Sequence, residues 1–143
     1  NAALGAVHSA TAVPPVLERS LEHIQNILFE AGAAVASLDP SAKQALFPEE
    51  TRWLEQSIDE VEARLPPLVN FILPGGGVAG SGLHWARTIA RRAERDVIAA
   101  LGHEPERAPL LAWINRLSDA LFVWARQVNH EQGVAETPWH SSV

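Results

Sequence analysis

Four arginines gather within a short stretch of the chain, and their spacing suits the binding of a polyanion. They are Arg87, Arg91, Arg92 and Arg95. The planar guanidinium group pairs well with phosphate and carboxylate oxygens. On a helix, like charges four residues apart repel one another. A solvated helix face is the common explanation for a charge run, but a triphosphate or an acidic patch on another subunit would account for the repetition.

The apolar residues around these arginines predict where they lie on their helix. Apolar residues recur at steps of three and four over 83–101, which is typical of one buried helix face. At about 100° per residue, Arg92 points away from this face. The charged residues at its border are Arg87, Arg91 and Glu94. These three are therefore placed to contact both the bundle and a ligand.

Asn115 and Phe71 are two further candidates for ligand contact. Asn115 directly follows Ile114 of another apolar stripe, so its amide can orient a sugar hydroxyl or a phosphate oxygen, or make a hydrogen bond between helices. Phe71 lies in a predicted loop, where an aromatic side chain is not needed for the core. Six other aromatic residues are expected in the core: Trp53, Trp85, Trp113, Phe122, Trp124 and Trp139.

The glycines over 75–80 fit the spacing G-x-G-x-x-G, which is found in dinucleotide-binding folds. Pro74 interrupts the preceding apolar run, and no second parallel strand follows. We therefore interpret 75–80 as a flexible turn between helices, in which glycine lets the backbone approach a ligand closely.

The histidines and acidic residues do not form a metal-binding pattern. Di-iron bundles need Glu-x-x-His pairs, and this chain has neither Glu-x-x-His nor His-x-x-x-His. Cysteine is absent, which rules out disulfides and thiolate ligands. We predict no metal site built from protein ligands.

The elements that position these residues are predicted to be helices. Amphipathic stripes cover 17–38, 54–65, 83–101 and 110–128, and 1–12 resembles the end of a fifth helix. Pro14-Pro15 and Pro48-Glu49-Glu50 mark helix starts, whereas Pro66-Pro67 and Gly102 mark helix ends. No segment alternates with period two, and flexible connections are expected at 39–47 and after Asn129. The fold class is all-α, an up-and-down five-helix bundle.

Length and charge limit the class of protein. A chain of 143 residues with 47% apolar residues suits a single domain over 1–143. The formal net charge of −6 argues against nucleic acid or an anionic membrane as partner. No apolar run approaches the roughly 18 residues that span a bilayer. We expect a cytoplasmic protein.

Three blocks of the sequence together resemble the PduO-type ATP:cob(I)alamin adenosyltransferases. They are FILPGG at 71–76, LHWARTIARRAER at 83–95 and NRLSDALF at 115–122. Residues 24–29 and 53–55 extend the resemblance to nearly the whole chain. It implies transfer of the 5′-deoxyadenosyl group of ATP to cob(I)alamin, giving adenosylcobalamin and triphosphate.

The resemblance also implies the site residues on the nucleotide side. ATP would lie at each subunit interface of a homotrimer, with Mg²⁺ sharing the phosphate charge, and Arg91 and Arg95 would stabilise the leaving triphosphate. The residues matching the family's nucleotide-binding positions are Arg91, Arg92, Ala93, Glu94, Arg95 and Asn115.

On the cobalamin side, the resemblance implies that Phe71 packs below the corrin ring and keeps the lower axial ligand off cobalt. His84 belongs to the same cobalamin-binding side, and Arg87 would form an ion pair between subunits. Phe71 and Arg91 are thus the expected catalytic residues. A reductase and an adenosylcobalamin-dependent enzyme are possible partners, and the first helix and a phosphate-binding segment with a lysine are expected to extend upstream of Asn1.

Two other classes of function stay open from the residues alone. A non-catalytic bundle could bind ATP or cobalamin as a sensor or carrier. A purely structural bundle could use the arginines only to join subunits.

Overall fold

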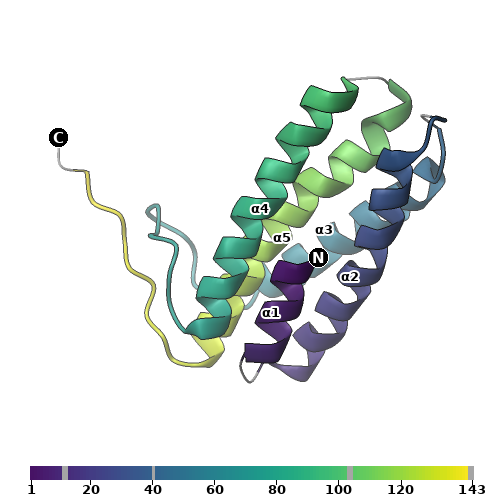
Figure 1. Cartoon of the computed structure of the whole chain (residues 1–143). Coiled ribbons are helices and arrows are strands. Elements are labelled where there is room, and N and C mark those ends of the chain that lie inside the picture. The colour runs from purple at the N-terminus through teal and green to yellow at the C-terminus, as the bar shows by residue number, and fades with distance from the viewer. Residues whose placement is uncertain (11–12, 40, 103–104, 142–143) are drawn as a thin grey trace.

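Helices make up nearly all of the regular structure in the computed structural model, which describes residues 1–10, 13–39, 41–102 and 105–141 (Figure 1). This confirms the predicted all-α fold. The short 3-10 helices are η1 (Gln44–Leu46) and η2 (Pro105–Arg107). The α-helices are α1 (Ala2–Ala10), α2 (Pro15–Ala36), α3 (Phe47–Glu62), α4 (Val78–Leu101) and α5 (Ala108–Glu131).

Helix α5 is the centre of the bundle. It packs most extensively on α4 and on α3, while α1 covers parts of α4 and α2 (Figure 1). Trp113 and Trp124 of α5 are buried, and Trp124 Nε1 donates a hydrogen bond to Ser57 Oγ of α3 at 3.1 Å. The final turns of α5, over 123–129, are buried on every side. Polar residues in these turns must therefore find partners within the protein.

The helix boundaries follow the predicted start and stop signals. Pro15 begins α2, and Glu49 and Glu50 lie in the first turn of α3, where the helix dipole favours acidic residues. Gly102 ends α4 with a φ of 74° and donates its N–H to the Ile98 carbonyl at 2.8 Å. Glycine is the usual residue for this left-handed position.

Two predicted boundaries were wrong. Ser37 adopts extended backbone and ends α2 at Ala36, so Leu38 is exposed and does not belong to the buried stripe. The connection predicted to be flexible over 39–47 is also more regular than expected. Residues 44–46 form η1, and Phe47 is the buried first residue of α3.

Two further corrections concern the loop before α4 and the tail after α5. Helix α4 begins at Val78, so Gly80 is helical rather than part of a turn. Helix α5 continues to Glu131, and the tail after it runs beside the loop between α3 and α4 (Figure 1). Ile72 and Pro138 form an antiparallel β-bridge there. The tail is therefore a part of the folded structure.

None of the helices within the described residues has the combination of length and apolar character that a membrane span requires.

Candidate active site

An open groove lies between the α3–α4 loop, the C-terminal tail, α4 and α5. Its volume is about 940 Å³. Its lining comes from residues 68–72 and Pro74 of the loop, His84 and Arg87 of α4, Phe122 of α5, and residues 139–141 of the tail. We call it the loop–tail groove. It unites Phe71, His84 and Arg87, which are separated in the sequence.

Phe71 lies at the exposed surface of this groove. Its side chain is 81% exposed, and its ring meets that of Trp139 edge-on, with 6.4 Å between the centroids. Leu68 and Val69 beside it are also exposed. A group of large apolar side chains open to solvent commonly marks a binding site. The groove thus offers an apolar surface to a ligand.

Charged and aromatic side chains form the wall of the groove on α4 and α5. The Arg87 guanidinium lies 5.5 Å from the centroid of the Phe122 ring, within range of a cation–π contact. The His84 ring meets Phe122 edge-on at 5.8 Å. Burial lowers the pKa of His84, the Arg87 charge lowers it further, and Glu136 acts in the opposite direction. The net effect favours the neutral form of the imidazole.

Arg87 also carries an unsatisfied polar atom. Its Nε is buried, with no hydrogen-bond partner among the residues that the structure describes. Buried N–H groups are nearly always paired. A ligand oxygen or a carboxylate from another subunit would complete the bonding of Arg87.

Further along α4, the other arginines form an exposed surface that we call the arginine ridge: Arg91, Arg92 and Arg95. Arg95 Nη1 donates to the Arg91 carbonyl at 3.1 Å. Within the described ranges, none of the three forms an ion pair. Their positive charge is therefore available to an anion.

Glu94 and Asn115 connect this ridge to α5. Glu94 is half-buried, as its predicted position at the border of the stripe implies, and it accepts a hydrogen bond from Asn115 Nδ2 at 2.9 Å. Arg87 is half-buried as well, whereas Arg91 is exposed. The structure thus places Ala93, Glu94 and Asn115 with the arginines, apart from Phe71 and His84 at the groove.

The sequence profile described as cobalamin adenosyltransferase matches residues 1–128. This chain belongs to the cobalamin adenosyltransferase family. It is 40% identical over 126 residues to a corrinoid adenosyltransferase of Bacillus subtilis (strain 168). The aligned region covers 88% of this chain and 65% of that protein. It is 48% identical over 109 residues to the corrinoid adenosyltransferase PduO of Salmonella typhimurium, covering 74% of this chain and 32% of that one.

A solved structure supports the same family assignment. A variant PduO-type ATP:corrinoid adenosyltransferase from Lactobacillus reuteri, complexed with cobalamin and ATP, aligns with a TM-score of 0.87 and 33% identity. The alignment covers 98% of this chain and 80% of that chain. This chain spans less than two thirds of the length of the first relatives named above.

Some residues of the candidate site were not predicted. Phe122 and Trp139 were expected in the core, but Phe122 lines the groove and Trp139 is 49% exposed. Trp85 is also exposed, whereas Trp113 and Trp124 are buried as predicted. Phe122 belongs to the NRLSDALF block, and its proximity in sequence to Asn115 was the available signal. Nothing in the sequence around Trp139 indicated that the tail returns to the loop.

Proposed function

We propose that this chain transfers the 5′-deoxyadenosyl group of ATP to cob(I)alamin, releasing triphosphate. The observation that carries the proposal is that one helix, α4, contributes both to the apolar loop–tail groove and to the arginine ridge. His84 and Arg87 line the groove, and Arg91 begins the ridge one helical turn beyond Arg87. A corrinoid and a polyphosphate could thus be held side by side. Membership of the family supports this choice of ligands.

Cobalamin would occupy the loop–tail groove. Phe71 and His84 are its cobalamin-binding residues in this proposal, with the Phe71 ring against the lower face of the corrin. An apolar ring in that place excludes a donor atom from the axial position of cobalt. Removing an axial donor lowers the energy of the cobalt orbital that accepts the next electron, which makes Co(II) easier to reduce to Co(I).

ATP would bind along the arginine ridge, near Asn115. The Co(I) electron pair attacks the ribose 5′ carbon, a cobalt–carbon bond forms, and the bond from that carbon to the phosphate oxygen breaks. Triphosphate leaves with the electrons of the broken bond. Arg91 and Arg95, with Arg92 beside them, stabilise that charge where it develops. Holding both reactants in line supplies the rest of the catalysis.

Mg²⁺ would arrive on the phosphates rather than in a protein site. Among the described residues, no three His, Cys, Asp or Glu side chains gather as a metal site. The described residues therefore offer no cluster of the oxygen ligands that a resident Mg²⁺ ion prefers. No step here depends on protein coordination of the metal.

The proposed assembly is a homotrimer with ATP at each subunit interface. The unsatisfied Nε of Arg87 supports an ion pair with a carboxylate of a neighbouring subunit. A reductase would supply the electron, and an adenosylcobalamin-dependent enzyme would receive the product. The lack of cysteine fits a cytoplasmic location.

The test is formation of a cobalt–carbon bond. The full-length protein is mixed with ATP, Mg²⁺ and chemically reduced cobalamin, and the visible spectrum is followed. We expect the adenosylcobalamin spectrum to develop in proportion to turnover. ATP-dependent thermal stabilisation without any cobalt–carbon bond would instead favour a non-catalytic ATP- or cobalamin-binding module, and would overturn the proposal.

A further inference from the structure

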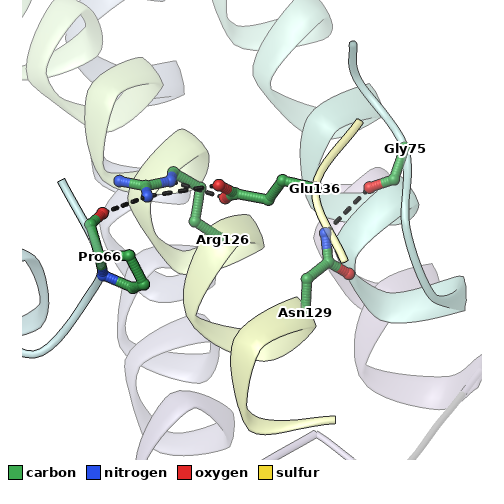
Figure 2. Close-up of polar contacts among 5 residues, drawn as sticks. All are labelled: Pro66, Gly75, Arg126, Asn129 and Glu136. Carbon is green, nitrogen blue, oxygen red and sulfur yellow. Dashed lines mark hydrogen bonds and ion pairs between the residues drawn. The ribbon is translucent and has the colours of Figure 1, made fainter. Parts of the chain in front are cut away.

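The loop that carries Phe71 is attached to the last turns of α5 at both of its ends. Apart from one β-bridge, the described residues between α3 and α4 form no strand. Arg126 and Asn129 of α5 nevertheless reach the start and the end of this loop (Figure 2). Both side chains are nearly inaccessible to solvent, at 4% and 2% exposed. The loop is therefore held by buried polar groups of the central helix.

Arg126 binds the start of the loop and the tail at the same time. Its Nη2 donates to the Pro66 carbonyl at 2.8 Å, and its Nε donates to Glu136 Oε1 at 2.7 Å. Figure 2 shows the guanidinium between these two partners. Charge-assisted hydrogen bonds of this kind are stronger than neutral ones. Arg126 thus links the start of the loop to the tail.

Asn129 binds the end of the loop. Its Nδ2 donates to the Gly75 carbonyl at 3.0 Å, and its Oδ1 accepts from the Gly77 N–H at 3.1 Å. Gly77 is the N-cap residue of α4, so the amide also satisfies one of the helix's unpaired N–H groups. One side chain therefore sets where the loop ends and where α4 begins.

The glycines of this segment leave space for the Asn129 amide. A Cβ atom at Gly76 or at Gly80 would collide with the Asn129 side chain. Gly76 also has a φ of 111°, a conformation that other residues rarely adopt. Close approach to Asn129 of α5 thus explains the glycines at Gly76 and Gly80.

The tail completes the attachment in the middle of the loop. The Leu73 N–H donates to the Thr137 carbonyl at 2.9 Å, and the Trp139 N–H donates to the Phe71 carbonyl at 2.7 Å. Glu136 directly precedes these paired tail residues, so its ion pair with Arg126 attaches the tail to α5 next to them. The backbone of Phe71 is consequently connected to α5 through the tail as well as through the loop.

We propose that Arg126 and Asn129 are positioning residues that hold Phe71 in place at the loop–tail groove. The inference rests on the proposed function, in which Phe71 packs against the corrin. Neither Arg126 nor Asn129 lines the groove, so both act through the backbone of the loop. A buried ion pair is often no more stabilising than apolar residues of similar volume. The presence of the Arg126–Glu136 ion pair is therefore explained better by control of the loop's position than by a gain in stability.

The test compares Asn129→Ala with the matched control Gln127→Ala. Gln127 is also a buried amide of α5, but it bonds Glu131 of its own helix at 2.8 Å. Each protein is assayed with Co(II) plus a reductant and, separately, with chemically prepared Co(I). Because small displacements of positioning groups cost about 100-fold in rate, we expect Asn129→Ala to lose roughly 10- to 100-fold with Co(II) and much less with Co(I). Gln127→Ala should keep the wild-type ratio of the two rates.

Electron paramagnetic resonance of the bound Co(II) form gives a readout that stability alone would not change. In the complex with ATP, the hyperfine splitting from an axial nitrogen should be lost in the wild type and retained in Asn129→Ala. If Asn129→Ala gives the same spectrum and the same ratio of the two rates as the wild type, the positioning role is wrong.

A second variant, Glu136→Gln, guards against loss of folding. Glu136 is partly exposed, at 28% of its side chain, and the glutamine keeps an oxygen for Arg126 while removing the charge. We expect a smaller shift of the rate ratio in the same direction, with faster hydrogen exchange at the amides of 71–77. An unchanged ratio despite faster exchange would overturn the proposal. A wild-type protein that forms no cobalt–carbon bond would instead overturn the proposed function, so the two failures are distinguishable.

Discussion

The Asn115 side chain of α5 donates a hydrogen bond to the Glu94 carboxylate of α4, with 2.9 Å between Nδ2 and Oε1. This bond holds the Glu94 carboxylate, which lies next to the arginine ridge in the sequence, against α5. The ridge arginines form no ion pair in the described part of the chain. An anion that approaches α4 therefore meets several positive charges, and the Glu94 carboxylate beside them is already engaged with Asn115. This arrangement is the physical basis for the nucleotide site proposed above.

The first prediction concerns Arg91. Arg91→Ala should weaken ATP binding, because a hydrogen bond to a charged group contributes about 1.5–3 kcal/mol, or roughly 10- to 150-fold in Kd. Isothermal titration calorimetry with Mg·ATP measures this loss. The matched control is Arg52→Ala, which removes another exposed arginine, on α3. Equal affinities of the two variants would contradict the nucleotide role and favour a bundle whose arginines only join subunits.

The second prediction concerns Phe71. Phe71→Ala should abolish most of the transfer from Co(II), because an axial donor could then reach cobalt, while ATP affinity stays unchanged. As the side chain is 81% exposed, the free energy of unfolding should change by less than about 0.5 kcal/mol.

Phe29→Ala is the control for this change, since Phe29 is 75% exposed on α2, away from the groove. Turnover measured with Co(II) and a reductant separates the two variants. If Phe71→Ala turns over as fast as Phe29→Ala, the assigned role of Phe71 is wrong.

The sequence was sufficient for the helices and for the arginine ridge because both depend on local patterns. The apolar period of α2 correctly marks Leu17, Leu21 and Ile24 as buried. Proline and glycine mark the beginning of α2 and the end of α4. Helical geometry correctly places Arg87 and Glu94 at half-buried positions, whereas Arg91, which was predicted at the same border, is exposed. Each of these inferences needs only neighbours within a few residues.

The attachment of the loop could not be predicted because its partners are distant in the sequence. Asn129 lies 54 residues from Gly75, and Arg126 lies 60 residues from Pro66. Both side chains bond backbone carbonyls, which carry no residue-specific pattern. The same reason explains the position of Trp139, which depends on backbone pairing between the tail and the loop. The assignment of ligands, in turn, came from resemblance to a family.

The third prediction compares two helical glycines. Alanine normally stabilises a helix relative to glycine by about 1 kcal/mol, so Gly32→Ala in α2, where an added Cβ would meet nothing within 4 Å, should raise the free energy of unfolding. Gly80→Ala in α4 should lower it, by about 1–3 kcal/mol as for other overpacked sites, because the methyl group collides with Asn129. Urea unfolding of both variants measures the difference in sign.

A double variant checks the cause of this difference. In an Asn129→Ala background the collision at Gly80 is removed, so Gly80→Ala should become neutral or stabilising there. Destabilisation of the same size in both backgrounds would show that Asn129 is not the obstacle.

The fourth prediction concerns pH and His84. Burial, reinforced by the charge of Arg87 on α4 and opposed by Glu136 of the tail, lowers the pKa of His84 in the folded protein. The unfolded chain, in which His84 has its ordinary pKa of 6.5, then binds the proton more readily than the folded protein does. The contribution of neutral His84 to stability is therefore fully present above pH 6.5. It is lost as the pH falls toward the lowered folded-state pKa. His84→Gln, which does not titrate, should therefore lose less stability than the wild type between pH 7.5 and pH 5.5.

The control is His8→Gln, which removes an exposed histidine on α1. Urea unfolding at both pH values gives the free energies to be compared. His8→Gln shows how far the removal of a surface histidine changes the measurement. A His84→Gln variant with the same pH dependence as the wild type would show that protonation of this buried imidazole does not limit stability in acid. In that case other groups of the protein would be responsible for the loss of stability in acid.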